Sequence, residues 1–125
     1  MTGGVEQAKV DWDADAPRSV FFSDIYFSGD GLAETRHVFL AGNDLERRFA
    51  DAERFAIAEL GFGSGLNMLA VWDLWRKTKK PAGARLELLS FEKHPLSIDD
   101  LMRAHRAWPE LGTLSARLID LYPAL

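Results

Sequence analysis

The chain has 125 residues, a formal net charge of −4 and no cysteine. Its length predicts one domain, because domains commonly run to roughly 100–200 residues, and 47% hydrophobic residues are enough for a core. The absence of cysteine excludes disulfides, iron–sulfur ligation and cysteine catalysis, and it fits a cytoplasmic protein. The acidic balance argues against a surface broadly attractive to nucleic acid. No apolar run approaches the roughly 20 residues of a membrane helix, so no membrane contact is expected.

The first third of the chain predicts a tail followed by a small extended unit. Residues 1–9 are polar and are expected to be disordered, so the folded domain is placed at 10–125. Aromatic residues between 10 and 28, interrupted by Pro17, predict two short extended pieces joined by a turn. This pattern is typical of a β-hairpin-like extension.

Residues 32–40 predict a short helix that ends at Gly42 and Asn43. Asp44 is placed to cap a following helical turn that runs through Phe49. The side chains expected on one side of the first helix are Leu32, Thr35, Arg36 and Phe39.

From residue 55 onward the pattern predicts strand, helix, strand, helix. Residues 55–60 carry little polarity, as expected for a strand covered on both faces in a parallel sheet. Residues 66–77 have helical spacing, 86–92 form the second strand, and Ser97 starts a helix with acids in its first turn. A last helix is expected over 111–121. This order implies parallel strands joined by right-handed crossovers, and hence an α/β, Rossmann-like fold.

The string ELGFGSGLN at 59–67 joins the first strand to its helix, where open α/β sheets bind nucleotides. Glycines allow a sharp turn and a close approach of ligand to backbone, and the helix N-terminus presents free N–H groups. The third glycine stands two residues after the second, not the three that a dinucleotide fingerprint needs. A phosphate loop needs Lys followed by Ser or Thr, which is absent here.

Glu92 ends the second strand, beside the glycine turn in the predicted sheet. A carboxylate at this place can accept hydrogen bonds from both hydroxyls of a ribose, each contributing about 1.5–3 kcal/mol. The alternative is a polar strand end without a ligand. Together with the glycine motif, Glu92 favours a nucleoside ligand.

The spacing E-x-G-x-G-x-G resembles the first motif of class I S-adenosylmethionine-dependent methyltransferases. Four blocks narrow the resemblance, and together with WPEL at 108–111 they are similar to the methyltransferase domain of the bifunctional tRNA 5-methylaminomethyl-2-thiouridine biosynthesis family. The blocks are DIYFS (24–28), ETRHVFLAGNDL (34–45), ELGFGSGLN (59–67) and FEKHPL (91–96). The resemblance covers nearly the whole chain, which looks like an N-terminal fragment of that domain.

The resemblance implies S-adenosylmethionine as cofactor and tRNA as partner. The methyl group would go to the aminomethyl nitrogen of 5-aminomethyl-2-thiouridine at the wobble position. In the full bifunctional protein, a flavin-dependent oxidoreductase domain first generates that amine.

The resemblance also implies roles for individual residues. The loop and its flanks would line the methionine end of the ligand, Glu92 would hold the ribose, and Lys93 would edge the adenine. Tyr26 and Asn43 would close over the cofactor, although each has a structural alternative, as a half-buried aromatic and as a helix stop. The predicted residues of the loop and its flanks are Glu59, Gly61, Phe62, Gly63, Gly65 and Asn67.

The family's catalytic segment, Asp-x-Phe-x-Pro-like and downstream of a later strand, does not occur in this sequence. The catalytic residue is therefore unknown, and the exposed edge after the last strand is expected to favour self-association. Two alternatives stay open: a methyltransferase for small molecules, and a non-catalytic remnant or interaction module with the same fold. His37, His94 and His105 lack metal-ligand spacing, so no metal site is expected.

Overall fold

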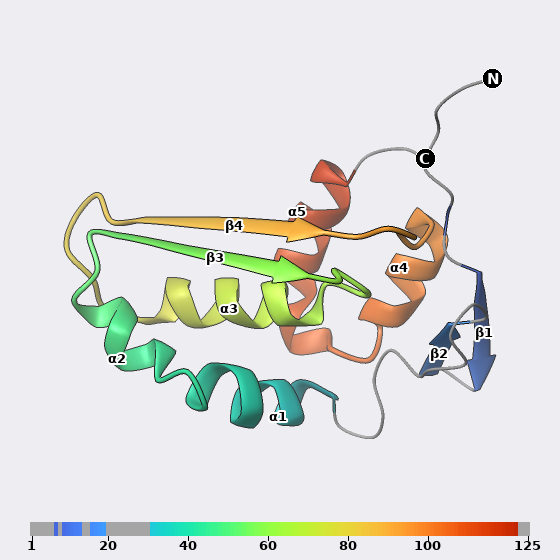
Figure 1. Ribbon diagram of the computed structural model, residues 1–125, viewed down its shortest axis with the longest axis horizontal. Coiled ribbons are helices and arrows are strands. Elements are labelled where there is room, and N and C mark those ends of the chain that lie inside the picture. Colours follow the sequence, from blue (N-terminus) through green and yellow to red (C-terminus); the bar gives the residue numbers. More distant parts are fainter. Residues whose placement is uncertain (1–6, 8, 14–15, 20–30, 123–125) are drawn as a thin grey trace.

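The computed structural model describes residues 7, 9–13, 16–19 and 31–122 (Figure 1). Most of the expected N-terminal tail and Tyr26 lie outside these residues. Strands β1 (Val10–Asp13) and β2 (Ala16–Ser19) pair antiparallel, so a hairpin-like unit is present, but β2 contains Pro17, which was expected at the break between the two extended pieces. The aromatic run after residue 19, expected to form the second piece, lies outside the described residues. The Trp12 indole N–H donates to Asp100 Oδ1 at 3.3 Å and so ties β1 to helix α4 (Ile98–His105).

The centre of the molecule is a β-α-β unit with two parallel strands. Strand β3 (Arg54–Leu60) pairs in parallel with β4 (Arg85–Phe91), and helix α3 (Leu66–Lys77) connects them. Figure 1 shows α3 lying along one face of this pair. The α/β architecture with a parallel sheet and flanking helices agrees with the expected Rossmann-like class.

The hydrophobic core lies between α3 and one face of the strands. Phe49, Leu69 and Val71 are fully buried there, and Phe49 meets the ring of Trp75 edge-on at 5.0 Å between centroids. Half-buried side chains from alternate strand positions pack against this core: Phe55, Ile57, Leu86 and Leu88.

The other face of the two strands is open, so the expectation that the first strand is covered on both faces was wrong. Exposure alternates along β3, and Leu60 is 89% exposed. Leu89 and Phe91 of β4 are also more than half exposed. The physical reason is that all the described helices that contact the sheet pack on the face that α3 covers (Figure 1).

The predicted helix over 32–40 is present as α1 (Gly31–Thr35) continued by the π-helix η1 (Arg36–Ala41). Thr35 is buried as expected, but Arg36 is exposed and does not share the buried side. A side chain at Gly42 would collide with the carbonyl oxygen of Val38, which explains why glycine ends this segment.

Helix α2 (Leu45–Ala50) follows, but the expected side-chain cap from Asp44 was wrong. Asp44 adopts a left-handed backbone conformation (φ 52°), and its carboxylate accepts a hydrogen bond from Arg47 instead of from a helix N–H. The helix start is therefore set by the backbone turn at Asp44.

The C-terminal part contains α4, the 3₁₀ turn η2 (Pro109–Leu111) and helix α5 (Gly112–Leu121). The predicted start of α4 is confirmed, because Ser97 Oγ accepts a hydrogen bond from the Asp100 N–H at 3.2 Å. Tyr122 follows α5, and its hydroxyl donates to the Leu96 carbonyl at 2.8 Å. The Tyr122–Leu96 bond thus links the end of α5 to the segment that precedes α4.

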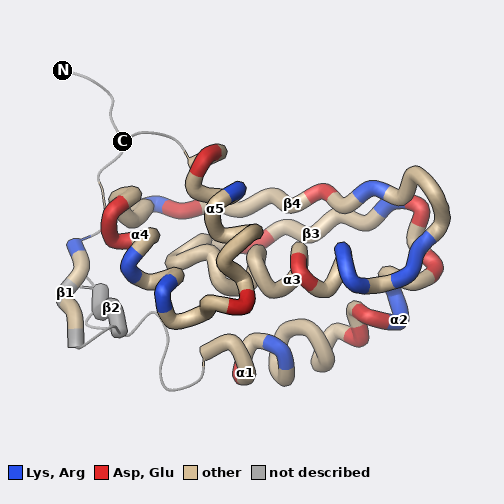
Figure 2. Tube along the Cα trace, turned by 180° about the vertical axis from the view of Figure 1, so that it is seen from behind, with Lys and Arg blue, Asp and Glu red and all other residues tan. Residues whose placement is uncertain are grey.

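Charged residues of both signs are interleaved at the α2 end of the molecule (Figure 2). Arg76 and Lys77 form ion pairs with the buried Asp73 at 3.1 and 2.9 Å, and Lys80 donates to the Trp75 carbonyl. These basic residues thus stabilise the C-terminal end of α3, where the helix dipole favours positive charge. In the described part of the chain, no helix is both long and apolar enough to cross a membrane.

Candidate cofactor site

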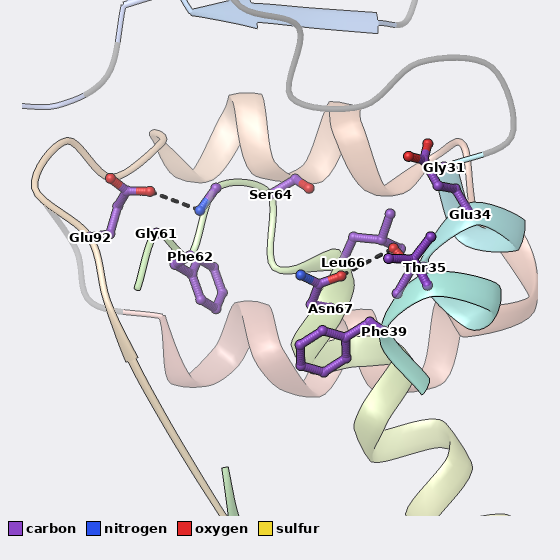
Figure 3. A pocket seen from close by; sticks show the side chains of 12 residues that line it. Gly31, Glu34, Thr35, Phe39, Gly61, Phe62, Ser64, Leu66, Asn67 and Glu92 are labelled. Atoms are coloured by element: carbon purple, nitrogen blue, oxygen red, sulfur yellow. Dashed lines mark hydrogen bonds between the residues drawn. The ribbon is translucent and has the colours of Figure 1, made fainter. Parts of the chain in front are cut away.

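A cavity of about 480 Å³ opens beside the glycine loop, at the carboxyl ends of β3 and β4. Figure 3 shows its walls: the loop and Glu92 on one side, and α1 with η1 on the other. It is lined by Gly31, Glu34, Thr35, Val38, Phe39, Gly61, Phe62, Gly63, Ser64, Leu66, Asn67 and Glu92. Five of these, Gly61, Phe62, Gly63, Asn67 and Glu92, are site residues that the sequence predicted.

The loop depends on glycine because three of its residues have positive φ. Gly61, Gly63 and Gly65 have φ of 90°, 57° and 79°, a region that other residues rarely adopt. A Cβ on Gly61 would meet no heavy atom within 4 Å, so this backbone is open to a ligand. Gly65 is different: a Cβ there would lie 2.7 Å from Phe62 Cζ. Gly65 thus permits the tight packing behind the loop and does not itself line the cavity.

Glu92 follows β4 directly and binds the loop. Its Oε1 accepts a hydrogen bond from the Gly63 N–H at 2.8 Å (Figure 3). Its Oε2 accepts one from the His94 N–H at 3.2 Å. An ionised carboxylate has about four acceptor positions. Glu92 is therefore fixed in place by the backbone and still able to accept hydrogen bonds from a ligand.

A chain of polar side chains connects the cavity to the strands. Thr35 Oγ1 donates to Asn67 Oδ1 at 3.1 Å, and Asn67 Nδ2 donates to Glu59 Oε2 at 3.3 Å. Ser90 Oγ donates to the other Glu59 oxygen at 2.9 Å. Burial raises the pKa of Glu59, the hydrogen bonds from Ser90 and Asn67 oppose this, and the nearby charge of Glu92 adds to it. A cation bound in the cavity would relieve the cost of ionising Glu59.

The wall formed by α1 and η1 contains functional positions that were not predicted as site residues. Thr35 is buried and orients Asn67, while the ring of Phe39 faces the cavity (Figure 3). Both were expected on one side of a helix, but the spacing alone does not say what that side faces. Its packing across the N-terminal end of α3 decides this.

The structure brings other predicted residues to different places. Glu59 lies behind the cavity and contacts it through Asn67. Asn43 is exposed, and its amide donates to the Phe39 carbonyl at 2.8 Å, which ends η1. Lys93 is exposed beyond Glu92. The described cavity lining contains neither Asn43 nor Lys93, and Tyr26 lies outside the described residues.

The cavity suits a cationic, hydroxyl-bearing small molecule. Its volume is within the range of about 300–1,000 Å³ found for small-molecule sites. Two carboxylates, Glu34 and Glu92, border it, and no Lys or Arg occurs among the described lining residues. A pyrophosphate would lack a cationic side chain to neutralise it. In the described residues no cluster of three His, Cys, Asp or Glu side chains is arranged for a metal ion.

No protein-family model matches the chain, but curated proteins do. The tRNA 5-methylaminomethyl-2-thiouridine biosynthesis bifunctional protein MnmC of Pseudomonas fluorescens is 52% identical over 100% of this chain. The proteins of the same name from Acinetobacter baylyi and Caulobacter vibrioides are 48% and 53% identical over 98% and 89% of it. The chain is a relative of the MnmC proteins.

This relationship confirms the resemblance drawn from the four sequence blocks. The match covers 20% of the Pseudomonas MnmC protein, 21% of the Acinetobacter protein and 19% of the Caulobacter protein. The chain thus spans about one fifth of the length of these MnmC relatives. Their name assigns them to the biosynthesis of a modified tRNA nucleoside.

Proposed function

We propose that this chain provides the S-adenosylmethionine-binding part of a tRNA methyltransferase. The observation that carries the proposal is the cavity beside the glycine loop, which has carboxylates on its walls and no described Lys or Arg. This combination favours a cationic nucleoside over a nucleotide phosphate. S-adenosylmethionine is such a nucleoside, since it carries a sulfonium, an ammonium and a ribose diol. The sequence relationship to MnmC proteins, whose name assigns them to the biosynthesis of a modified tRNA nucleoside, supports tRNA as the substrate.

The two ends of the ligand would bind to described residues on two sides of the cavity. Glu92, held by the Gly63 and His94 N–H groups, would accept the ribose hydroxyls. Asn67 would hold the methionine end, with the half-buried Glu59 behind it, and the ligand's ammonium would offset the cost of an ionised Glu59. Each group is already oriented by hydrogen bonds within the protein, which lowers the entropic cost of binding.

The proposed reaction is methylation of the aminomethyl nitrogen of 5-aminomethyl-2-thiouridine at the wobble position of tRNA. The cofactor supplies an activated methyl group, and the substrate amine must be unprotonated to accept it. No described residue is assigned as the catalytic base. The proposed setting is the cytoplasm, with a flavin-dependent oxidoreductase domain as the source of the amine.

The first test is calorimetric titration of the chain with S-adenosylhomocysteine, which has the same ribose and methionine ends. Glu92→Gln keeps an oxygen for the Gly63 N–H but removes charge from the ribose side. We expect at least tenfold weaker binding, equal to about 1.4 kcal/mol. The matched control is Glu87→Gln in β4, where Glu87 pairs with Arg54 at 2.6 Å on the open face. This variant should leave affinity unchanged.

No binding by the folded chain would contradict cofactor binding, and equal effects of the two variants would contradict the role of Glu92. The substrate is tested separately, by transfer of labelled methyl to undermodified tRNA in the full-length protein carrying this segment. Labelling of small amines without labelling of tRNA would favour a small-molecule methyltransferase.

A non-catalytic interaction module is the competing function, and the open face of the sheet favours it. Leu60, Leu89 and Phe91 expose apolar surface there, at 89%, 58% and 54%. Self-association through this face predicts a dimer by light scattering that Leu60→Lys converts to a monomer. Such a dimer without measurable affinity for S-adenosylhomocysteine would replace the methyltransferase proposal.

A further inference from the structure

We propose that His105 is a positioning residue, which holds the glycine loop in its ligand-binding shape through a hydrogen bond from Nε2–H to the Ser64 carbonyl. His105 is the last residue of α4 and lies 41 positions along the chain from the loop. The identity of the ligand at this loop rests on the proposed function, whereas the hydrogen bond between His105 and Ser64 does not.

The geometry fixes the tautomer of the imidazole ring. His105 Nε2 lies 2.7 Å from the Ser64 carbonyl oxygen, and Nδ1 lies 2.6 Å from Ser115 Oγ in α5. A carbonyl oxygen can only accept a hydrogen bond, so Nε2 carries the proton. In the neutral ring Nδ1 is then an acceptor, and the Ser115 hydroxyl donates to it.

The surroundings keep this ring neutral and immobile. His105 is 6% exposed, and its ring packs against Trp108 with centroids 5.6 Å apart. Burial lowers the pKa of His105, and the bond to Ser64 opposes this only in part. Both ring nitrogens are engaged, so the side chain has one orientation and presents one N–H to the loop.

The carbonyl that accepts this hydrogen bond belongs to a residue in the middle of the glycine loop. Ser64 stands between Gly63 and Gly65, which both have positive φ, and it lines the cavity while being 5% exposed. Glu92 holds the loop from the ligand side, at the Gly63 N–H. His105, which is not among the described cavity-lining residues, holds the loop at the carbonyl of the following residue, Ser64. Two bonds on successive residues thus fix the peptide orientations between them.

Two substitutions separate this role from simple packing. In His105→Gln the amide nitrogen is as many bonds from Cβ as Nε2 is, so it can still donate to the Ser64 carbonyl. In His105→Asn the amide reaches only as far as Nδ1, so it can meet Ser115 but not Ser64. The affinity for S-adenosylhomocysteine is measured by calorimetry and the unfolding midpoint by circular dichroism, for wild type and both variants.

We expect His105→Gln to bind within about threefold of wild type and His105→Asn to bind at least tenfold more weakly, a difference of about 1.4 kcal/mol. A purely structural role would lower affinity only in step with stability, so equal affinities of the two variants at equal stability would overturn the proposal. Absence of binding by the wild type would instead contradict the proposed function.

A spectroscopic measurement on the wild-type chain needs neither a variant nor a ligand. Long-range ¹H–¹⁵N correlation spectra distinguish the two neutral tautomers of histidine from the imidazolium. We expect His105 to show the Nε2–H form at neutral pH, with slow exchange of that proton. An Nδ1–H tautomer, which leaves Nε2 without a proton for the Ser64 carbonyl, would overturn the proposal, even if His105→Asn fails to fold.

Discussion

Replacing Gly65 by alanine tests whether the loop is shaped by its backbone or by its packing. Gly65 has φ 79° and precedes α3, where an added Cβ would lie 2.7 Å from Phe62 Cζ and 3.2 Å from Leu118 Cδ2. Gly61 provides a matched control, because it has φ 90° but open space around its Cβ position. Both variants introduce the same side chain at positive φ, and only one introduces a collision.

The expected free energies follow from these two terms. A residue other than glycine in the left-handed region costs about 1–2 kcal/mol, partly offset by about 0.4–1 kcal/mol because alanine restricts the unfolded chain. These terms apply to both variants, so Gly61→Ala should lower the free energy of unfolding by about 1 kcal/mol. The contacting atoms are the ends of the Phe62 and Leu118 side chains, which can shift, so overpacking adds about 1 kcal/mol, the low end of its usual range. Gly65→Ala should therefore lower the free energy of unfolding by about 2 kcal/mol.

Urea unfolding followed by circular dichroism measures both values, and calorimetry with S-adenosylhomocysteine measures binding. Because Gly61 lines the cavity, its variant should weaken binding more than its small loss of stability suggests. Gly65→Ala should weaken binding less than its larger loss of stability suggests, because Gly65 does not line the cavity. Equal losses of stability in the two variants would refute the assignment of Gly65 to packing behind the loop.

Two further predictions concern Glu59 and the start of α4. Burial raises the pKa of Glu59 in the free protein, and a bound ammonium would lower it, so ligand binding at mildly acidic pH should release protons. Calorimetry in buffers of different ionisation enthalpy detects this release, and Glu59→Gln should abolish it; proton uptake would contradict the placement of the ammonium. Ser97→Ala removes the acceptor for the Asp100 N–H and should lower the free energy of unfolding by about 1 kcal/mol without changing affinity; a variant as stable as wild type in urea would show that this cap contributes nothing.

The sequence by itself determined the elements of the β-α-β unit. Helix α3 spans the residues predicted from the spacing of apolar side chains, because a helix that covers a sheet must repeat its buried positions every three to four residues. The glycine loop was predicted equally well, because few residue types other than glycine adopt the positive φ found at Gly61, Gly63 and Gly65. Local chemistry also placed the cap at Ser97.

Asp44 shows where local chemistry fails. Its residue type favours a side-chain cap, yet the chain turns there in the left-handed conformation and the carboxylate binds Arg47. The expected two-sided cover of β3 failed for a related reason. A run of apolar residues indicates that a strand is hydrophobic, but it does not indicate which face of the strand the helices cover.

Only the tertiary structure decided how the site is assembled. Thr35 and Phe39 become cavity walls because α1 and η1 pack against α3, and Glu92 meets Gly63 because the parallel register brings two strand ends together. In the sequence, His105 is one of three histidines without metal-ligand spacing. The fold brings its side chain to the carbonyl of Ser64. Periodicity and residue type report local conformation, whereas contacts between residues 29 to 41 positions apart depend on how the elements pack.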